Sequence, residues 1–110
     1  MTTDSAFIAA ADQTLAIIGS ALDAALAASD ADLDWSVNDG ILEIECEDGS
    51  KVIVNRHVPN REIWVAARSG GFHYRWDGQV WRNTRDGSEL FAALSALLSE
   101  QLGRGVRLLR

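Results

Sequence analysis

Several residue types are rare or missing in this sequence. Its 110 residues include one cysteine, one proline and two histidines, and the first fifty residues contain no lysine or arginine. A single cysteine excludes an internal disulfide and a cysteine-rich metal cluster. The apolar stretch of residues 7–28 is interrupted by Asp12 and Asp23 and has no basic flank, so we expect neither a transmembrane segment nor a signal peptide. Without an export signal, we expect the chain to stay in the cytoplasm.

The charged residues are divided unevenly along the chain. Residues 1–50 carry eleven acidic side chains, a charge of −11, whereas residues 51–110 carry ten basic and five acidic side chains, a charge of +5. The total of −6 argues against nucleic acid as a partner, because phosphate binding needs a concentrated basic surface. The acidic half is better suited to a cation or a basic protein surface. The alternative is that these carboxylates only keep the protein soluble.

Apolar periodicity predicts one helix near each end of the sequence. Residues 4–28 carry apolar side chains at steps of three or four, which form one helical face. The segment Asp86-Gly87-Ser88-Glu89 resembles a capping box with Asp86 at the N-cap, and Gly103 is the expected C-cap of the second helix. Residues 106–109 are expected to lie back on the core. The apolar positions are Phe7, Ala11, Leu15, Ile18, Leu22 and Leu26 in the first helix, and Leu90, Phe91, Leu94, Leu97, Leu98 and Leu102 in the second.

Between the helices the pattern is typical of β-strands. Asp-Gly pairs at 39–40, 48–49 and 77–78 favour hairpin turns. The expected strands cover residues 35–38, 41–47 and 51–56, one strand after Pro59, one after Gly71, and residues 79–84. No strand needs a crossover connection. We therefore expect an α+β fold in a single domain over residues 1–110, a two-layer sandwich with two helices packed on one face of a six-stranded antiparallel sheet.

Alternation in residues 62–68 predicts what the open face of the sheet carries. Ile63 and Val65 are expected to face the core, which turns Trp64 and Arg68 to the other side. A tryptophan among polar strand residues is typical of a protein-binding surface; the alternative is a tryptophan half-covered by its neighbours. His57 is expected to be a solvated loop side chain. The same face is expected to carry Glu43, Glu45, Glu47, Asn55, His73 and Arg75.

Metal binding is the main chemical possibility. Asp30, Asp32 and Asp34 match the start of an EF-hand calcium loop, but Trp35 and Ile41 stand where that loop needs Gly and Glu. What remains is an open cluster of hard oxygen ligands, suited to weak binding of iron or manganese. A solvated acidic loop is the alternative interpretation.

Motifs of conventional catalysis are missing. The sequence contains no phosphate-binding loop, no Gly-x-Ser-x-Gly and no His-Glu-x-x-His. Cys46 alternates with glutamates and shares a face with Leu42 and Ile44, so we expect a core residue and not a nucleophile. The sequence therefore argues against an enzyme.

Nearly the whole chain resembles the frataxin family, most closely its bacterial CyaY type. The resemblance runs from Asp4-Ser5-x-Phe7 and Ala11-Asp12-Gln13 to the final helix. Relatives often have Gln where this chain has Glu62. The most specific motifs are Asp48-Gly49-Ser50-Lys51, Val54-Asn55-Arg56, Pro59-x-x-Glu62-Ile63-Trp64 and Gly70-Gly71-Phe72-His73.

This resemblance implies the fold expected above and a role in iron–sulfur cluster assembly. Family members bind iron weakly and transiently, as Fe²⁺ or Fe³⁺, through an acidic ridge, and dock on the cysteine desulfurase–scaffold complex. The resemblance implies no membrane partner, and a monomer in which iron-dependent oligomerisation remains open. Carried over, the metal-binding ridge is Asp4, Asp12, Asp23, Asp30, Asp32 and Asp34. The partner-binding residues are Asp23, Glu43, Glu45, Asn55, Trp64, Arg68 and His73, of which Asn55 and Trp64 match the family's sheet contacts.

Two functional hypotheses follow. The first is an iron-binding accessory or regulatory protein of iron–sulfur cluster assembly. The second is a pure acidic protein-interaction module in which metal binding is incidental. A ferroxidase-like enzyme ranks below both, because such centres use Glu-x-x-His ligands that this chain lacks.

Overall fold

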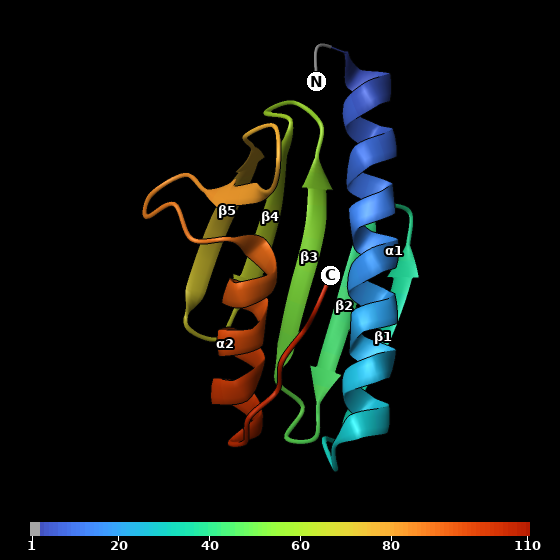
Figure 1. Ribbon diagram of the computed structural model, residues 1–110, viewed down its shortest axis with the longest axis vertical. Coiled ribbons are helices and arrows are strands. Elements are labelled where there is room, and N and C mark those ends of the chain that lie inside the picture. The colour runs from blue at the N-terminus through green and yellow to red at the C-terminus, as the bar shows by residue number, and fades with distance from the viewer. Residues whose placement is uncertain (1–2) are drawn as a thin grey trace.

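Six strands form one antiparallel sheet whose spatial order follows the sequence (Figure 1). The computed structural model describes residues 3–110. Each strand pairs with the next through a hairpin, which confirms the predicted meander. The strands are β1 (Leu33–Asn38), β2 (Ile41–Cys46), β3 (Lys51–His57), β4 (Glu62–Ala67), β5 (Gly70–Trp76) and β6 (Trp81–Asn83).

Two helices, α1 (Asp4–Ala28) and α2 (Leu90–Leu102), lie on the same face of this sheet (Figure 1). The predicted two-layer α+β sandwich is therefore confirmed. By length and composition α1 could also cross a membrane. Its apolar side chains, however, pack on the sheet, and Phe7, Ile18 and Leu22 are fully buried. This packing accounts for the hydropathy of α1 as that of a core helix.

The core joins the two ends of the chain. Phe7 of α1 meets Trp81 of β6 edge to face, with ring centroids 6.1 Å apart. After α2 the chain turns at Gly103, which has the left-handed conformation expected of a C-cap. The tail then returns to the core, where Val106 and Leu108 are buried, as predicted.

Several element boundaries differ from the sequence-based expectation. Strand β2 ends one residue earlier, at Cys46, and β3 ends one residue later, at His57. Strand β1 begins at Leu33, which is buried under α1, and not at Trp35. Strand β6 is only three residues long, because the carboxylate of Asp77 accepts the N–H groups of Gln79 and Val80 and keeps them in a turn.

Helix α2 begins at Leu90 with Glu89 as its N-cap, so the prediction of Asp86 at the N-cap was wrong. The Glu89 carboxylate accepts the N–H groups of Phe91 and Ala92. Asp86 instead binds the N–H and hydroxyl of Ser88 in the preceding turn.

Candidate functional site

The three predicted ligands on α1 are each held by another side chain. Asp4 accepts from Arg61 at 3.1 Å, and Asp12 forms an ion pair with Arg56 of β3. Asp23 accepts the indole N–H of Trp35 at 2.8 Å. Side chains on β1, β3 and the turn before β4 therefore fix these carboxylates along the helix.

Arg56 links α1 to the turn between β1 and β2. Besides Asp12 it approaches Asp39 at 3.4 Å, and its guanidinium lies over Gly40. A Cβ atom at Gly40 would lie 2.5 Å from Arg56 Nε, and Gly40 has a φ of +77°. The positive φ favours glycine at this turn, and any side chain there would also displace the Arg56 guanidinium.

The three aspartates that follow α1 are arranged differently from those on the helix. Asp30 and Asp32 are exposed and form no hydrogen bond or ion pair within residues 3–110. Asp34 lies on β1 directly opposite Glu45 of β2. No group of three acidic, histidine or cysteine side chains in the described part of the chain is close enough to hold a metal ion. The predicted ligands are therefore spread along α1 and β1, and their role as ligands stays a prediction.

On the open face of the sheet, Trp64 is stacked between two histidines. The ring of His57 lies 3.6 Å from that of Trp64 with an interplanar angle of 10°, and the ring of His73 lies 4.3 Å away at 8°. The histidines come from β3 and β5, on either side of β4, so they cover opposite faces of the indole. This arrangement matches the half-covered alternative for Trp64.

His57 differs from the expectation of a solvated loop residue. It is the last residue of β3, and its Nδ1 atom is buried without a hydrogen-bond partner in residues 3–110. The sequence-based prediction ended β3 at Arg56. In the structure the strand continues by one residue, and His57 pairs with Glu62 of β4.

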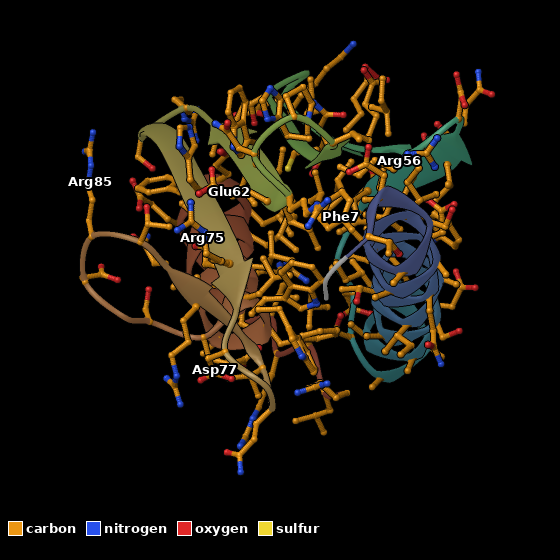
Figure 2. All side chains as sticks on the ribbon, turned by 90° about the horizontal axis from the view of Figure 1, so that it is seen from above. Phe7, Arg56, Glu62, Arg75, Asp77 and Arg85 are labelled. Carbon is orange, nitrogen blue, oxygen red and sulfur yellow. The ribbon has the colours of Figure 1, made fainter. Side chains whose placement is uncertain are left out.

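Glu62 is the second residue that sequence reasoning missed. It is buried, with 4% of its surface exposed, although it lies on the open face. Its carboxylate accepts the Trp64 indole N–H at 2.9 Å and the Arg75 guanidinium at 2.6 Å, and lies 3.7 Å from His73 Nδ1. The side chains of Glu62 and Arg75 lie close to each other in Figure 2. The available signal was alternation, which puts Glu62 on the same face as Trp64.

The remaining predicted contact residues lie on or beside the same face. Glu43 pairs with Lys51 at 3.4 Å, and Asn55 lies opposite Trp64. Glu45 is exposed. Arg68 lies in the turn between β4 and β5 and forms an ion pair with Asp48 at 3.2 Å.

Asp48 has a lowered pKa because the side chain and N–H of Ser50 donate to its carboxylate, with a smaller contribution from Arg68. Asp48 lies in the turn between β2 and β3, so the Arg68–Asp48 pair is located at that end of the sheet.

Cys46 is buried in the core, as predicted.

Comparison with known proteins places this geometry in a family. A family model for the Frataxin-like domain matches residues 1–104. The chain is similar to the iron-sulfur cluster assembly protein CyaY of Dechloromonas aromatica, at 58% identity over 94% of this chain and 95% of the relative. The corresponding protein of Cupriavidus taiwanensis is 50% identical over 92% and 91% of the two chains.

Solved structures have the same fold. The chain is similar to the frataxin of Psychromonas ingrahamii, with a TM-score of 0.83 and 31% identity over 99% of this chain and 100% of that one. A trimeric yeast frataxin from Saccharomyces cerevisiae, complexed with ferrous iron, matches in fold with a TM-score of 0.73 and 23% identity over 86% of each chain. Family profile, close relatives and fold agree, and the chain belongs to the frataxin-like family.

Proposed function

We propose that this protein is an iron-binding accessory and regulatory protein of iron–sulfur cluster assembly that docks on the cysteine desulfurase–scaffold complex. The proposal is supported by relatives of about the same length that are named as assembly proteins. One structural observation carries it: α1, β1 and β2, which hold the acidic half of the sequence, lie together on one side of the molecule (Figure 1).

In this proposal iron is cargo, held briefly by carboxylates. Asp34 lies directly opposite Glu45, and two like charges in that position repel each other. A cation bound between them, with help from Asp30 and Asp32, would relieve the repulsion. Because no preformed group of three ligands exists in residues 3–110, binding is expected to be weak and reversible. Asp4, Asp12 and Asp23 are ligands of second rank, because each already has a partner.

Docking uses the acidic side together with the open sheet face. Asp23, Glu43 and Glu45 would meet a basic patch of the desulfurase. Asn55, Trp64 and His73 would contact the partner surface next to that patch. Arg68 would lie at the edge of this contact area. The attraction between exposed charges is largely screened beyond about 8 Å at physiological ionic strength, and over shorter distances at higher salt, so affinity should fall as salt rises. We further propose that the chain works in the cytoplasm as a single-domain monomer, without catalysis of its own.

The test is a pair of NMR titrations of the labelled protein, one with Fe²⁺ under anaerobic conditions and one with the desulfurase. The proposal expects iron to shift amide signals of residues 30–34 and Asp23. It expects the desulfurase to shift these signals and those of Asn55 and Trp64. Silence in both titrations would refute it.

The second candidate is an interaction module in which metal binding is incidental. Substitutions that neutralise the carboxylates distinguish it from the first. Asn at positions 30, 32 and 34 keeps the size of the side chains and removes three charges. If iron transfer to the scaffold is unchanged in this triple variant while desulfurase affinity falls, the interaction module is correct. If transfer is lost, iron binding is part of the function.

A further inference from the structure

The indole of Trp64 is displaced along its own strand. Glu62 and Ala66 are its two neighbours on the open face of β4, two residues away on either side. The indole N–H is bonded to Glu62, and the ring stacks on His57, whose partner across the strands is Glu62. The indole therefore leans toward the Glu62 end and away from Ala66.

This displacement leaves a hollow on the sheet where the indole would otherwise lie. The hollow has a volume of about 220 Å³. Its floor is low because Ala66 is small and Gly71, directly opposite on β5, has no side chain. On the open face it is lined by Ile53, Asn55, Trp64, Ala66, Gly71 and His73.

We propose that this hollow, called here the Ala66 socket, receives one aliphatic side chain of the docking partner, and that Glu62 is the positioning residue that keeps it open. The inference rests on the proposed function, because it concerns the same partner. It adds the chemistry of one contact and a role for a buried carboxylate that does not itself touch the partner.

The size and lining of the socket select this occupant. Small-molecule sites usually measure roughly 300–1,000 Å³, so the socket suits a single side chain better than a metabolite. Ile53, Ala66 and the aromatic rings offer apolar surface, and no described carboxylate or guanidinium lines it. The Asn55 amide at its border can bond a peptide group beside the inserted side chain.

The socket is also continuous with the acidic surface of the proposed docking site. Ile53, one of its walls, lies directly opposite Glu43 on β2. A partner segment seated on the acidic side therefore reaches the socket without crossing a different surface. Because the ring stack holds Trp64 in place before binding, little side-chain entropy is lost on docking.

The first experiment fills the socket. Ala66→Leu and Gly71→Val add side chains to its floor. Both variants should fold, because Ala66 is exposed and a Cβ at Gly71 has no atom closer than 4.0 Å. Ala96→Leu, an equal change on the exposed surface of α2, is the matched control. We expect both socket variants to bind the desulfurase–scaffold complex at least about tenfold more weakly, and the control to bind like the unmodified protein.

The second experiment releases the indole. Glu62→Leu removes the acceptor of the Trp64 N–H, whereas Glu62→Gln retains an acceptor oxygen. We expect the Leu variant to shift the Trp64 indole resonance, assigned with Trp64→Phe, and to give an NOE between the indole and the Ala66 methyl group. Its affinity should fall about as far as that of Ala66→Leu, and Gln should restore both signal and binding.

The outcomes separate this inference from the proposed function. If the unmodified protein binds the complex and the filled variants bind equally well, the socket is refuted while docking stands. If Glu62→Leu leaves the indole resonance in place, the positioning role of Glu62 is refuted. If the unmodified protein does not bind the complex, the proposed docking fails and the socket fails with it.

Discussion

The indole N–H of Trp81 donates to the hydroxyl of Thr14 at 2.9 Å in the buried core, joining two residues 67 positions apart. The same hydroxyl donates to the carbonyl of Ala10 at 2.8 Å. One side chain therefore satisfies the only polar atom of a fully buried tryptophan and ties β6 to α1. Without Thr14, the indole N–H would lie in the core with no acceptor.

Thr14→Val should therefore destabilise the fold although it preserves volume. An unsatisfied buried donor costs about 1–3 kcal/mol, and we expect a loss of that size in the free energy of unfolding measured by urea denaturation. Thr14→Ser, which keeps the hydroxyl, should lose less than half as much. Equal losses in the two variants would show that packing and not the hydrogen bond matters here.

Removing Arg56 should strengthen iron binding on α1 if Asp12 is a ligand. In Arg56→Gln, Asp12 and Asp39 lose the guanidinium that now pairs with both. An exposed ion pair is worth about 0.2–1 kcal/mol, so the Kd for Fe²⁺ should fall by roughly 1.5- to 5-fold in anaerobic calorimetry.

Arg85→Gln is the control for Arg56→Gln, because Arg85 projects away from the body of the molecule (Figure 2) and the change in net charge is the same. An equal effect of both substitutions would mean that only net charge influences iron. No effect of either would remove Asp12 from the set of ligands.

Gly19→Ala should destabilise α1, contrary to the usual preference of helices. Alanine normally stabilises a helix interior by about 1 kcal/mol relative to glycine. At this position, however, the added methyl group would lie 2.6 Å from the Trp35 ring, which is held in place by Asp23. We expect thermal unfolding a few degrees below that of the unmodified protein. Gly105→Ala, which meets no atom within 4 Å, should change little.

Asp77 should contribute to acid unfolding. Hydrogen bonds from the N–H groups of Val80 and Gln79 and from Arg82 lower its pKa from 3.8 to about 2. Because the folded pKa lies below the unfolded value, the ionised form favours folding. This contribution is complete above the unfolded pKa and is lost as pH falls from about 4 to about 2.

Urea midpoints measured from neutral pH down to about pH 2 test this contribution. Asp77→Asn should be less stable than the unmodified protein near neutral pH, and the difference should shrink through the window given above. Asp32→Asn, at an exposed position outside any hydrogen bond in residues 3–110, should follow the unmodified protein. A constant difference at every pH would exclude titration of Asp77 as the cause.

The layers and faces of this fold could be predicted because burial dictates them. Each helix or strand turns one apolar side to the core. This explains the helical period of α1 and the alternation of Ile63 and Val65 in β4, and both of these strand residues are buried as expected. The start of β6 and the start of α2 could not be predicted as well. There, Asp77 and Asp86 bind backbone or side-chain donors in local turns, and such bonds compete with strand and helix.

The site was harder to predict than the fold. Alternation assigns Glu62, Trp64 and His73 to one face, but it does not say which way an indole leans. That direction depends on the pairing of β3 with β4 and on a carboxylate buried among its neighbours. The stack on His57 therefore required the structure.

The packing of α1 also has a consequence for biosynthesis. Phe7 and Thr14 contact Trp81, and the core closes only when α2 and the tail at Val106 and Leu108 are in place. During translation the apolar face of α1 leaves the ribosome before the sheet that covers it has been made. The nascent chain thus carries an uncovered, membrane-like helix while the sheet and α2 are being made, and is exposed to chaperones and to aggregation until residues 106–108 emerge.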